Sequence, residues 1–129
     1  MAKKISGLDE HWTAFIKCIL VHMLLPLLPL FIEWLLTHKI SNSSYTITIA
    51  IYAMTIGASS TNSIIAIICI FIGIIFSVLY GAAVSNPKLI FDIQLWSIMA
   101  LLTIFVPHAL ERYNRHVYEK QEFKIFGQK

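Results

Sequence analysis

The sequence predicts an all-α integral membrane protein, a four-helix bundle with short loops and a cytosolic helical tail at its C-terminus. Hydrophobic residues make up 57% of the 129 residues and charged residues only 13%, about half of the roughly 25% that soluble domains carry. The charges gather at the two ends of the chain. Between them lie apolar runs that approach the ~20 residues a helix needs to cross a membrane.

The apolar runs divide the chain into spans followed by one tail. Short polar turns rich in Ser, Asn, Thr and Gly separate the runs from one another. We expect transmembrane helices at about 12–36, 45–60, 64–84 and 93–110, in one domain over residues 1–110, with a charged tail over residues 111–129.

Two tryptophans mark the expected edges of the first span. A helix from Trp12 to Trp34 is ~33 Å long at ~1.5 Å per residue, close to the ~30 Å hydrocarbon thickness of a bilayer. Tryptophan prefers both membrane interfaces, which fits these positions. Pro26 and Pro29 lie between them and each removes a backbone hydrogen bond, so we expect this helix to be kinked.

The second span has the weakest helix signal. Residues 45–52 alternate between polar and apolar side chains, which in a soluble protein would indicate a strand. An isolated strand in lipid leaves its backbone groups unpaired, so we expect a helix, with a re-entrant segment as the alternative. The third span carries no charge and is rich in Ile, and Trp96 marks one interface of the fourth.

The distribution of basic residues predicts the orientation. With four spans both ends of the chain share one side of the membrane. Three spans would place the two basic ends on opposite sides, which the preference of basic residues for the cytosolic side disfavours. The side with both ends would hold Lys3, Lys4, Arg112, Arg115, Lys120, Lys124 and Lys129, against Lys39 and Lys88 on the other. This bias predicts both termini in the cytosol, and the high Ile content suggests a bacterial inner membrane.

A polar seam is the first candidate site. His22 and Glu33 share one face of the first span, and Tyr52 and Thr55 belong to a stripe of hydroxyl side chains on the second. Ionisable groups at membrane depth are costly, so they tend to face a bundle interior or water. These four residues predict a proton or ion path. In the alternative, Glu33 reaches water, His22 bonds a neighbouring helix, and the hydroxyls pack between helices or bond their own carbonyls.

Small residues at four-residue spacing predict helix packing. Gly73, Ser77 and Gly81 form two such steps on the third span, and Ala53 and Gly57 form one on the second. Small side chains let helix backbones approach closely in lipid. The steps could hold these two spans together within one chain or join chains in a homo-oligomer.

A cluster of charged residues follows the fourth span. Glu111 with Arg115, and Arg115 with Glu119, have the four-residue spacing of helical ion pairs, so we expect this helix to continue beyond the membrane. In one interpretation the tail lies on anionic headgroups. In the other it docks a cytosolic partner, and the candidate residues are His108, Arg112, Arg115, Tyr118, Phe123 and Phe126.

No recognised catalytic or metal-binding motif occurs in the sequence, so we expect neither an enzyme nor a bound cofactor or metal. Cys18 and Cys69 lie inside apolar runs, which favours packing over a disulfide. The formal charge of +3 comes from cations that flank apolar segments. These are topology signals and do not predict binding to nucleic acid.

The leading hypothesis is a non-enzymatic membrane subunit that oligomerises and anchors or signals to a cytosolic partner. The alternatives are an oligomeric pore or ion-conducting protein and an immunity-type membrane protein. In size and span number the whole chain resembles bacteriocin-immunity proteins, multi-span holins and membrane subunits of small antiphage systems such as Kiwa. That resemblance of architecture implies a place in bacterial defence.

Overall fold

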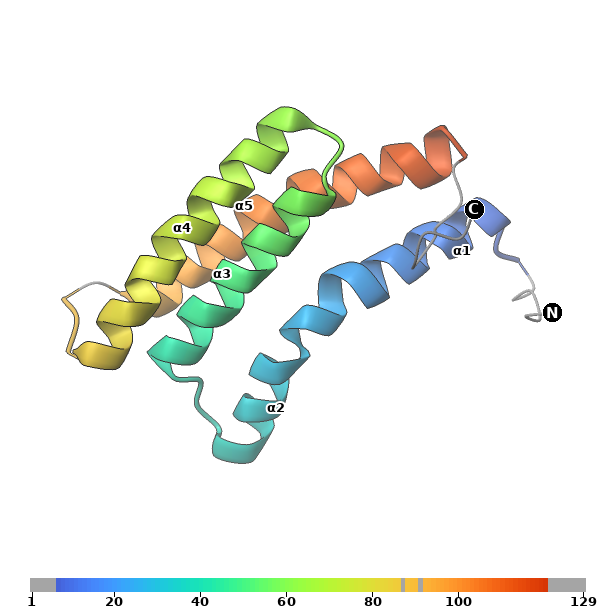
Figure 1. The fold of residues 1–129 in the computed structure, drawn as a ribbon. Coiled ribbons are helices and arrows are strands. Elements are labelled where there is room, and N and C mark those ends of the chain that lie inside the picture. The colour runs from blue at the N-terminus through green and yellow to red at the C-terminus, as the bar shows by residue number, and fades with distance from the viewer. Residues whose placement is uncertain (1–6, 87, 91, 121–129) are drawn as a thin grey trace.

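A computed structural model of the protein describes residues 7–86, 88–90 and 92–120. Every regular element in these ranges is a helix. In chain order they are α1 (Glu10–Lys17), η1 (Cys18–Leu24), η2 (Leu25–Leu27), α2 (Leu28–Thr37), α3 (Asn42–Ser59), α4 (Ser63–Ser85), α5 (Ile93–Tyr113) and η3 (Asn114–Tyr118). In Figure 1, α3, α4 and α5 lie side by side, and the N-terminal helix, from α1 to α2, runs along one side of them.

The N-terminal helix is irregular at its two prolines. Its backbone is α-helical in α1, has π-helical bonding in η1, tightens to a 3-10 turn in η2 and becomes α-helical again in α2. Pro26 and Pro29 lack a backbone N–H, so the regular bonding pattern cannot continue past them. The sequence predicted a kink at these prolines, and the structure shows a change of helix type there. The helix ends at His38, whose φ of 54° is left-handed.

Among the described residues, three helical segments are long and apolar enough to cross a membrane: Glu10–Thr37, Ser63–Ser85 and Ile93–Tyr118. They match the predicted spans at 12–36, 64–84 and 93–110. The segment predicted at 45–60 is α3, so the expectation of a helix rather than a strand is confirmed. Of the four predicted spans, α3 alone does not reach that level of hydrophobicity.

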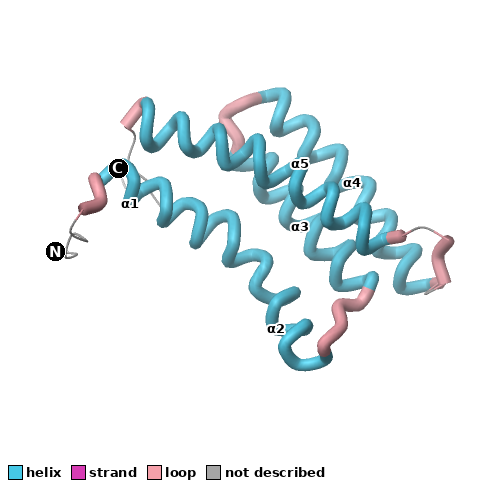
Figure 2. The backbone as a smooth tube through the Cα atoms, turned by 180° about the vertical axis from the view of Figure 1, so that it is seen from behind, coloured by secondary structure: helices cyan, strands magenta, loops and turns pink. Residues whose placement is uncertain are grey.

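The helix α3 lies at the centre of the bundle. It packs along α4 and also contacts α5, α2 and η2 (Figure 2). Ile49, Tyr52 and Ile56 of α3 form the core together with Met23 of η1 and Ile104 of α5. A helix surrounded by other helices meets little lipid, which explains why α3 can be the least apolar of the four.

The outer face of α4 is apolar and exposed. Ile64, Phe71 and Val78 leave 69%, 64% and 69% of their surface uncovered. A soluble protein rarely exposes so large a continuous apolar surface. Together with the three long apolar helices, this surface identifies a membrane protein.

Two glycines allow α3 and α4 to approach closely. A Cβ atom at Gly57 would lie 3.0 Å from Cys69 Cβ and 3.2 Å from the Ala66 carbonyl oxygen. A Cβ atom at Gly73 would lie 2.8 Å from Met54 Cγ. By contrast, a Cβ atom at Gly81 would have no neighbour within 4 Å. Gly57 and Gly73 thus serve packing within the chain, and Gly81 does not.

We predict that Gly57→Leu destabilises the bundle by about 1–3 kcal/mol, the usual cost of overpacking. The Ala66 carbonyl cannot move aside without disturbing α4. Thermal unfolding of the purified chain in detergent, followed by circular dichroism, measures the effect. Gly81→Leu is the matched control and should leave the midpoint nearly unchanged. Equal midpoints for the two variants would contradict the close approach at Gly57.

Candidate functional site

A cluster of polar side chains lies where the end of α3, the start of α4 and the last turns of α5 meet. We call it the Arg112 cluster. Its members come from the N-terminal helix, from the α3–α4 turn and from α5: His22, Ser59, Ser60, Thr61, His108, Glu111 and Arg112. Pro107 lies inside α5, one turn before Glu111, and the C-terminal end of that helix approaches α1 (Figure 1).

Arg112 is the central residue of the cluster. It is only 7% exposed. Its Nη2 donates to the carbonyl oxygen of Ser59 at 2.8 Å, and its Nε donates to His108 Nε2 at 3.2 Å. Ser59 is the last residue of α3, where the carbonyls have no partner within the helix. A cation is favourable there because the C-terminus of a helix carries partial negative charge.

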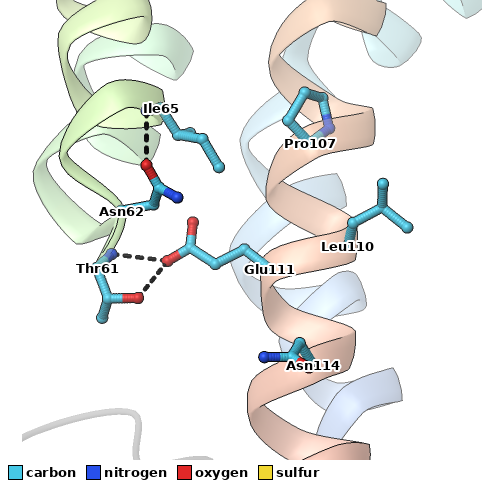
Figure 3. Close-up of a pocket in the computed structure, with 7 residues that line it drawn as sticks. All are labelled: Thr61, Asn62, Ile65, Pro107, Leu110, Glu111 and Asn114. Atoms are coloured by element: carbon cyan, nitrogen blue, oxygen red, sulfur yellow. Dashed lines mark hydrogen bonds between the residues drawn. The ribbon is translucent and has the colours of Figure 1, made fainter.

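Glu111 binds the other side of the same turn. Its carboxylate accepts hydrogen bonds from the Thr61 backbone N–H at 2.7 Å, the Thr61 hydroxyl at 2.6 Å and the Ser60 hydroxyl at 2.7 Å. Figure 3 shows Glu111 reaching from α5 to Thr61. Thr61 directly precedes Asn62, the N-cap of α4, where an anion is favourable. Two consecutive residues of α5 therefore complement the two helix ends that flank the α3–α4 turn.

The hydrogen bonds determine which nitrogen of His108 carries its proton. An arginine Nε can only donate, so His108 Nε2 must accept, and the ring proton is on Nδ1. That nitrogen lies 3.4 Å from Glu111 Oε2. His108 is 0% exposed. The arrangement thus requires a neutral His108 ring held between Arg112 and Glu111.

His22 joins the N-terminal helix to the cluster. Its Nε2 lies 2.9 Å from the Ser59 hydroxyl, and its ring centroid is 5.7 Å from that of His108. The Ser59 hydroxyl donates its proton to the Ile56 carbonyl, so His22 Nε2 is the donor to Ser59. This contact agrees with the alternative to an ion path, in which His22 forms a hydrogen bond with a neighbouring helix.

The other three residues of the predicted seam, Glu33, Tyr52 and Thr55, do not bond to one another or to His22. Glu33 accepts from the Ser41 backbone N–H in the loop before α3. Thr55 is exposed and donates to the carbonyl of Ile51 in its own helix. Tyr52 is buried in the core, and its hydroxyl has no hydrogen-bond partner within the part of the chain that the structure describes. These three side chains therefore lie in three different environments, and none of them belongs to the Arg112 cluster.

The predicted docking residues separate into three groups. His108 and Arg112 lie inside the protein, bonded within the cluster, so they do not face a partner. Arg115 is half-buried, and Tyr118 is 80% exposed. Phe123 and Phe126 lie outside the described residues. Sequence reasoning placed Glu111 in an ion pair with Arg115 and missed its bonds to Ser60 and Thr61, because nothing in the sequence brings residues 60 and 111 together.

Neither cysteine contributes to the cluster. Cys18 and Cys69 are both free and buried. Over residues 7–86, 88–90 and 92–120, no group of three or more His, Cys, Asp or Glu side chains could hold a metal ion. The Arg112 cluster is accordingly described by its hydrogen bonds and charges.

Known proteins provide no relative for this arrangement. No family model, curated protein or solved structure matches the chain. The chemistry of the cluster and the way it joins the helices are the grounds on which a function can be inferred.

We predict that Glu111→Gln loosens the α3–α4 turn. The uncharged amide has one acceptor oxygen in place of two, so the bonds to Thr61 and Ser60 cannot all persist. The loss should cost about 1.5–3 kcal/mol, the range for hydrogen bonds to a charged group. Hydrogen–deuterium exchange in peptides that contain Thr61 should be faster than in the unmodified protein. The control is Glu119→Gln, an exposed position on the same extension, and equal exchange in both variants would argue against the capping role.

Proposed function

We propose that the protein is a non-enzymatic subunit of the bacterial inner membrane that assembles with copies of itself. It anchors or signals to a cytosolic partner through the extension that begins after Leu110. The observation that carries this proposal is the Arg112 cluster. It attaches the base of the extension to the N-terminal helix, to the end of α3 and to the start of α4. A change in how the helices pack would therefore reach the extension directly.

Four crossings with both ends in the cytosol are part of the proposal. The rings of Trp12 and Tyr113 lie 5.7 Å apart, and those of Phe15 and Tyr113 lie 5.6 Å apart. The start of the first helix thus meets the end of the last, which favours an even number of crossings. With its 18 residues, α3 is ~27 Å long and can serve as the fourth. The basic residues favour the cytosolic side for both ends.

The outer face of α4 supports self-assembly. Gly57 and Gly73 are occupied by packing within the chain, but Ser77 and Gly81 are exposed. The Ser77 hydroxyl donates to the Gly73 carbonyl of its own helix, so it carries no unsatisfied donor into lipid. Small residues on a lipid-facing surface allow a second helix to approach closely.

We predict that Ser77→Cys forms a disulfide-linked dimer in oxidised membranes. The measurement is a non-reducing gel, with little background from the buried Cys18 and Cys69. Ile75→Cys is the matched control, because it is exposed at a similar depth but lies about 200° away around the helix. Gly81→Leu, added to Ser77→Cys, should abolish the dimer. A dimer that forms equally well from Ile75→Cys would exclude this face as the specific contact.

The extension itself supports a cytosolic partner. Tyr118 projects from η3 with 80% of its surface exposed, and an amphipathic aromatic ring of this kind is typical of protein interfaces. The preceding residues of the extension are held by the cluster and by ring contacts with Trp12 and Phe15. These contacts hold the residues before Tyr118 in place and leave its side chain exposed.

We predict that a second protein co-purifies with the tagged full chain when it is extracted from its host membrane in mild detergent. Tyr118→Ala should lower the recovery of that protein at least about fivefold, since interface tyrosines are often hot spots of 1–2 kcal/mol or more. Tyr80→Ala, on α4, is the control and should leave recovery unchanged. A single-chain monomer without any partner would refute the proposal.

An oligomeric pore and an immunity-type protein are the alternatives. Met23, Ile49, Ile56 and Ile104 fill the centre of the bundle, so a pore would have to run between copies of the chain. None of the contacts described above favours either alternative over a subunit that binds a partner.

A further inference from the structure

The ring of His108 offers its single acceptor nitrogen to Arg112. Its Nε2 accepts from Arg112 Nε at 3.2 Å, and its Nδ1, which carries the ring proton, lies 3.4 Å from Glu111 Oε2. The ring is 0% exposed. An imidazole has two nitrogens, so a second proton can bind this ring only at Nε2. That is the position to which Arg112 is bonded.

A proton and Arg112 therefore compete for the same nitrogen. A doubly protonated ring donates from both nitrogens and accepts at neither, so its Nε2–H would point at the N–H of Arg112. Two cations would also lie side by side in a buried place, where their repulsion is strong. Arg112 has to move away when the ring takes up a proton, and its bond to the Ser59 carbonyl depends on the position that it leaves.

The other groups around the ring leave this competition in place. His22 of η1 donates to Ser59 from Nε2, so it can take up a proton on its other nitrogen and keep that bond. Glu111 attracts a proton to the ring, but its carboxylate already accepts three hydrogen bonds from Ser60 and Thr61. Among the described residues, the remaining buried or half-buried charged and titratable side chains on the elements packed against this end of α5 are His11, Cys18, Tyr52, Cys69, Arg115 and His116.

We propose that uptake of one proton by His108 releases the base of the cytosolic extension from α3. The inference rests on the proposed function, because it assigns a regulatory signal to the same extension. At neutral pH the Arg112 cluster holds the extension against the bundle. When the cytosol becomes acidic, the ring takes the proton, Arg112 leaves the Ser59 carbonyl, and the residues that present Tyr118 are freed from α3.

The strength of the response follows from thermodynamic linkage. The attached state has no acceptor left for the proton, whereas the ring of the released state meets water, where a histidine is half-protonated at about pH 6.5. The ratio of released to attached molecules therefore rises as the pH falls below that value, and the rise approaches about tenfold per pH unit. Such coupling is reciprocal, so a partner that binds the released extension would cause proton uptake.

Labelling of the native thiol of Cys18 tests the release. This side chain is 0% exposed and directly follows α1, which packs against η3, so a reagent should reach it when the extension moves away. The purified full chain in detergent is treated with dithiodipyridine, and mass spectrometry of peptides separates Cys18 from Cys69. Because thiolate formation itself changes with pH, each rate is divided by that of His108→Gln at the same pH. The glutamine amide can accept from Arg112 but takes up no proton.

We expect this ratio at Cys18 to rise about eightfold when the pH falls from about 6 to about 5. Cys69, packed against Gly57 inside the bundle, reports general loosening and should show no such rise. His22→Gln is the matched control and should respond like the unmodified chain. A flat ratio at Cys18, an equal rise at Cys69, or loss of the response in His22→Gln would each overturn the proposal.

A spectroscopic measurement tests the same device without any substitution, should His108→Gln fail to fold. Nuclear magnetic resonance of the chain labelled with nitrogen-15 histidine distinguishes the two ring nitrogens. At neutral pH we expect the His108 ring to carry its proton on Nδ1 and none on Nε2. On acidification its protonation should follow the same pH curve as the labelling of Cys18. The opposite tautomer at neutral pH, or two separate curves, would refute the competition between the proton and Arg112.

These measurements use the chain alone, so they can fail independently of the proposed partner. A pH-insensitive cluster would leave co-purification of a cytosolic protein unaffected. Absence of such a protein would leave the release of the extension by protons unaffected.

Discussion

The buried guanidinium of Arg112 is the interaction on which the arrangement of this protein depends. A cation inside a helix bundle needs hydrogen-bond partners there. Arg112 meets this requirement with the last carbonyl of α3 and with a neutral His108 ring. Its neighbour Glu111 binds the first residues of the next helix. These two neighbouring charges therefore join the end of α3 and the start of α4 to the last turns of α5.

The same cluster also connects the N-terminal helix to the other three long helices. His22 brings in the N-terminal helix, whose first turn also packs its aromatic rings against Tyr113 of α5. Glu111 and Thr61 belong to the cluster and also line a hollow between the start of α4 and the second half of α5. A change in helix packing near the α3–α4 turn would therefore act on the same residues that hold the end of α5.

Packing inside the bundle accounts for the composition of α3. Its small residues meet α4, and its core residues meet η1 and α5. A helix covered on several sides needs close-fitting side chains more than lipophilic ones. The hydropathy of α3 therefore underestimates how much of this helix is buried against the other helices. The composition of α4 follows the opposite rule. Most of its surface is strongly apolar and faces outward, and only one narrow face is buried against the protein.

The sequence by itself determined the helices, three apolar spans and the irregularity at Pro26 and Pro29, because these depend on neighbours along the chain. It also identified Gly57 and Gly73 as packing positions, without saying that they serve contacts within one chain. Only the tertiary structure decided that His108 and Arg112 face inward and that Glu111 binds Ser60 and Thr61. Hydrogen bonds across fifty residues depend on how helices meet, and spacing along one helix does not carry that information.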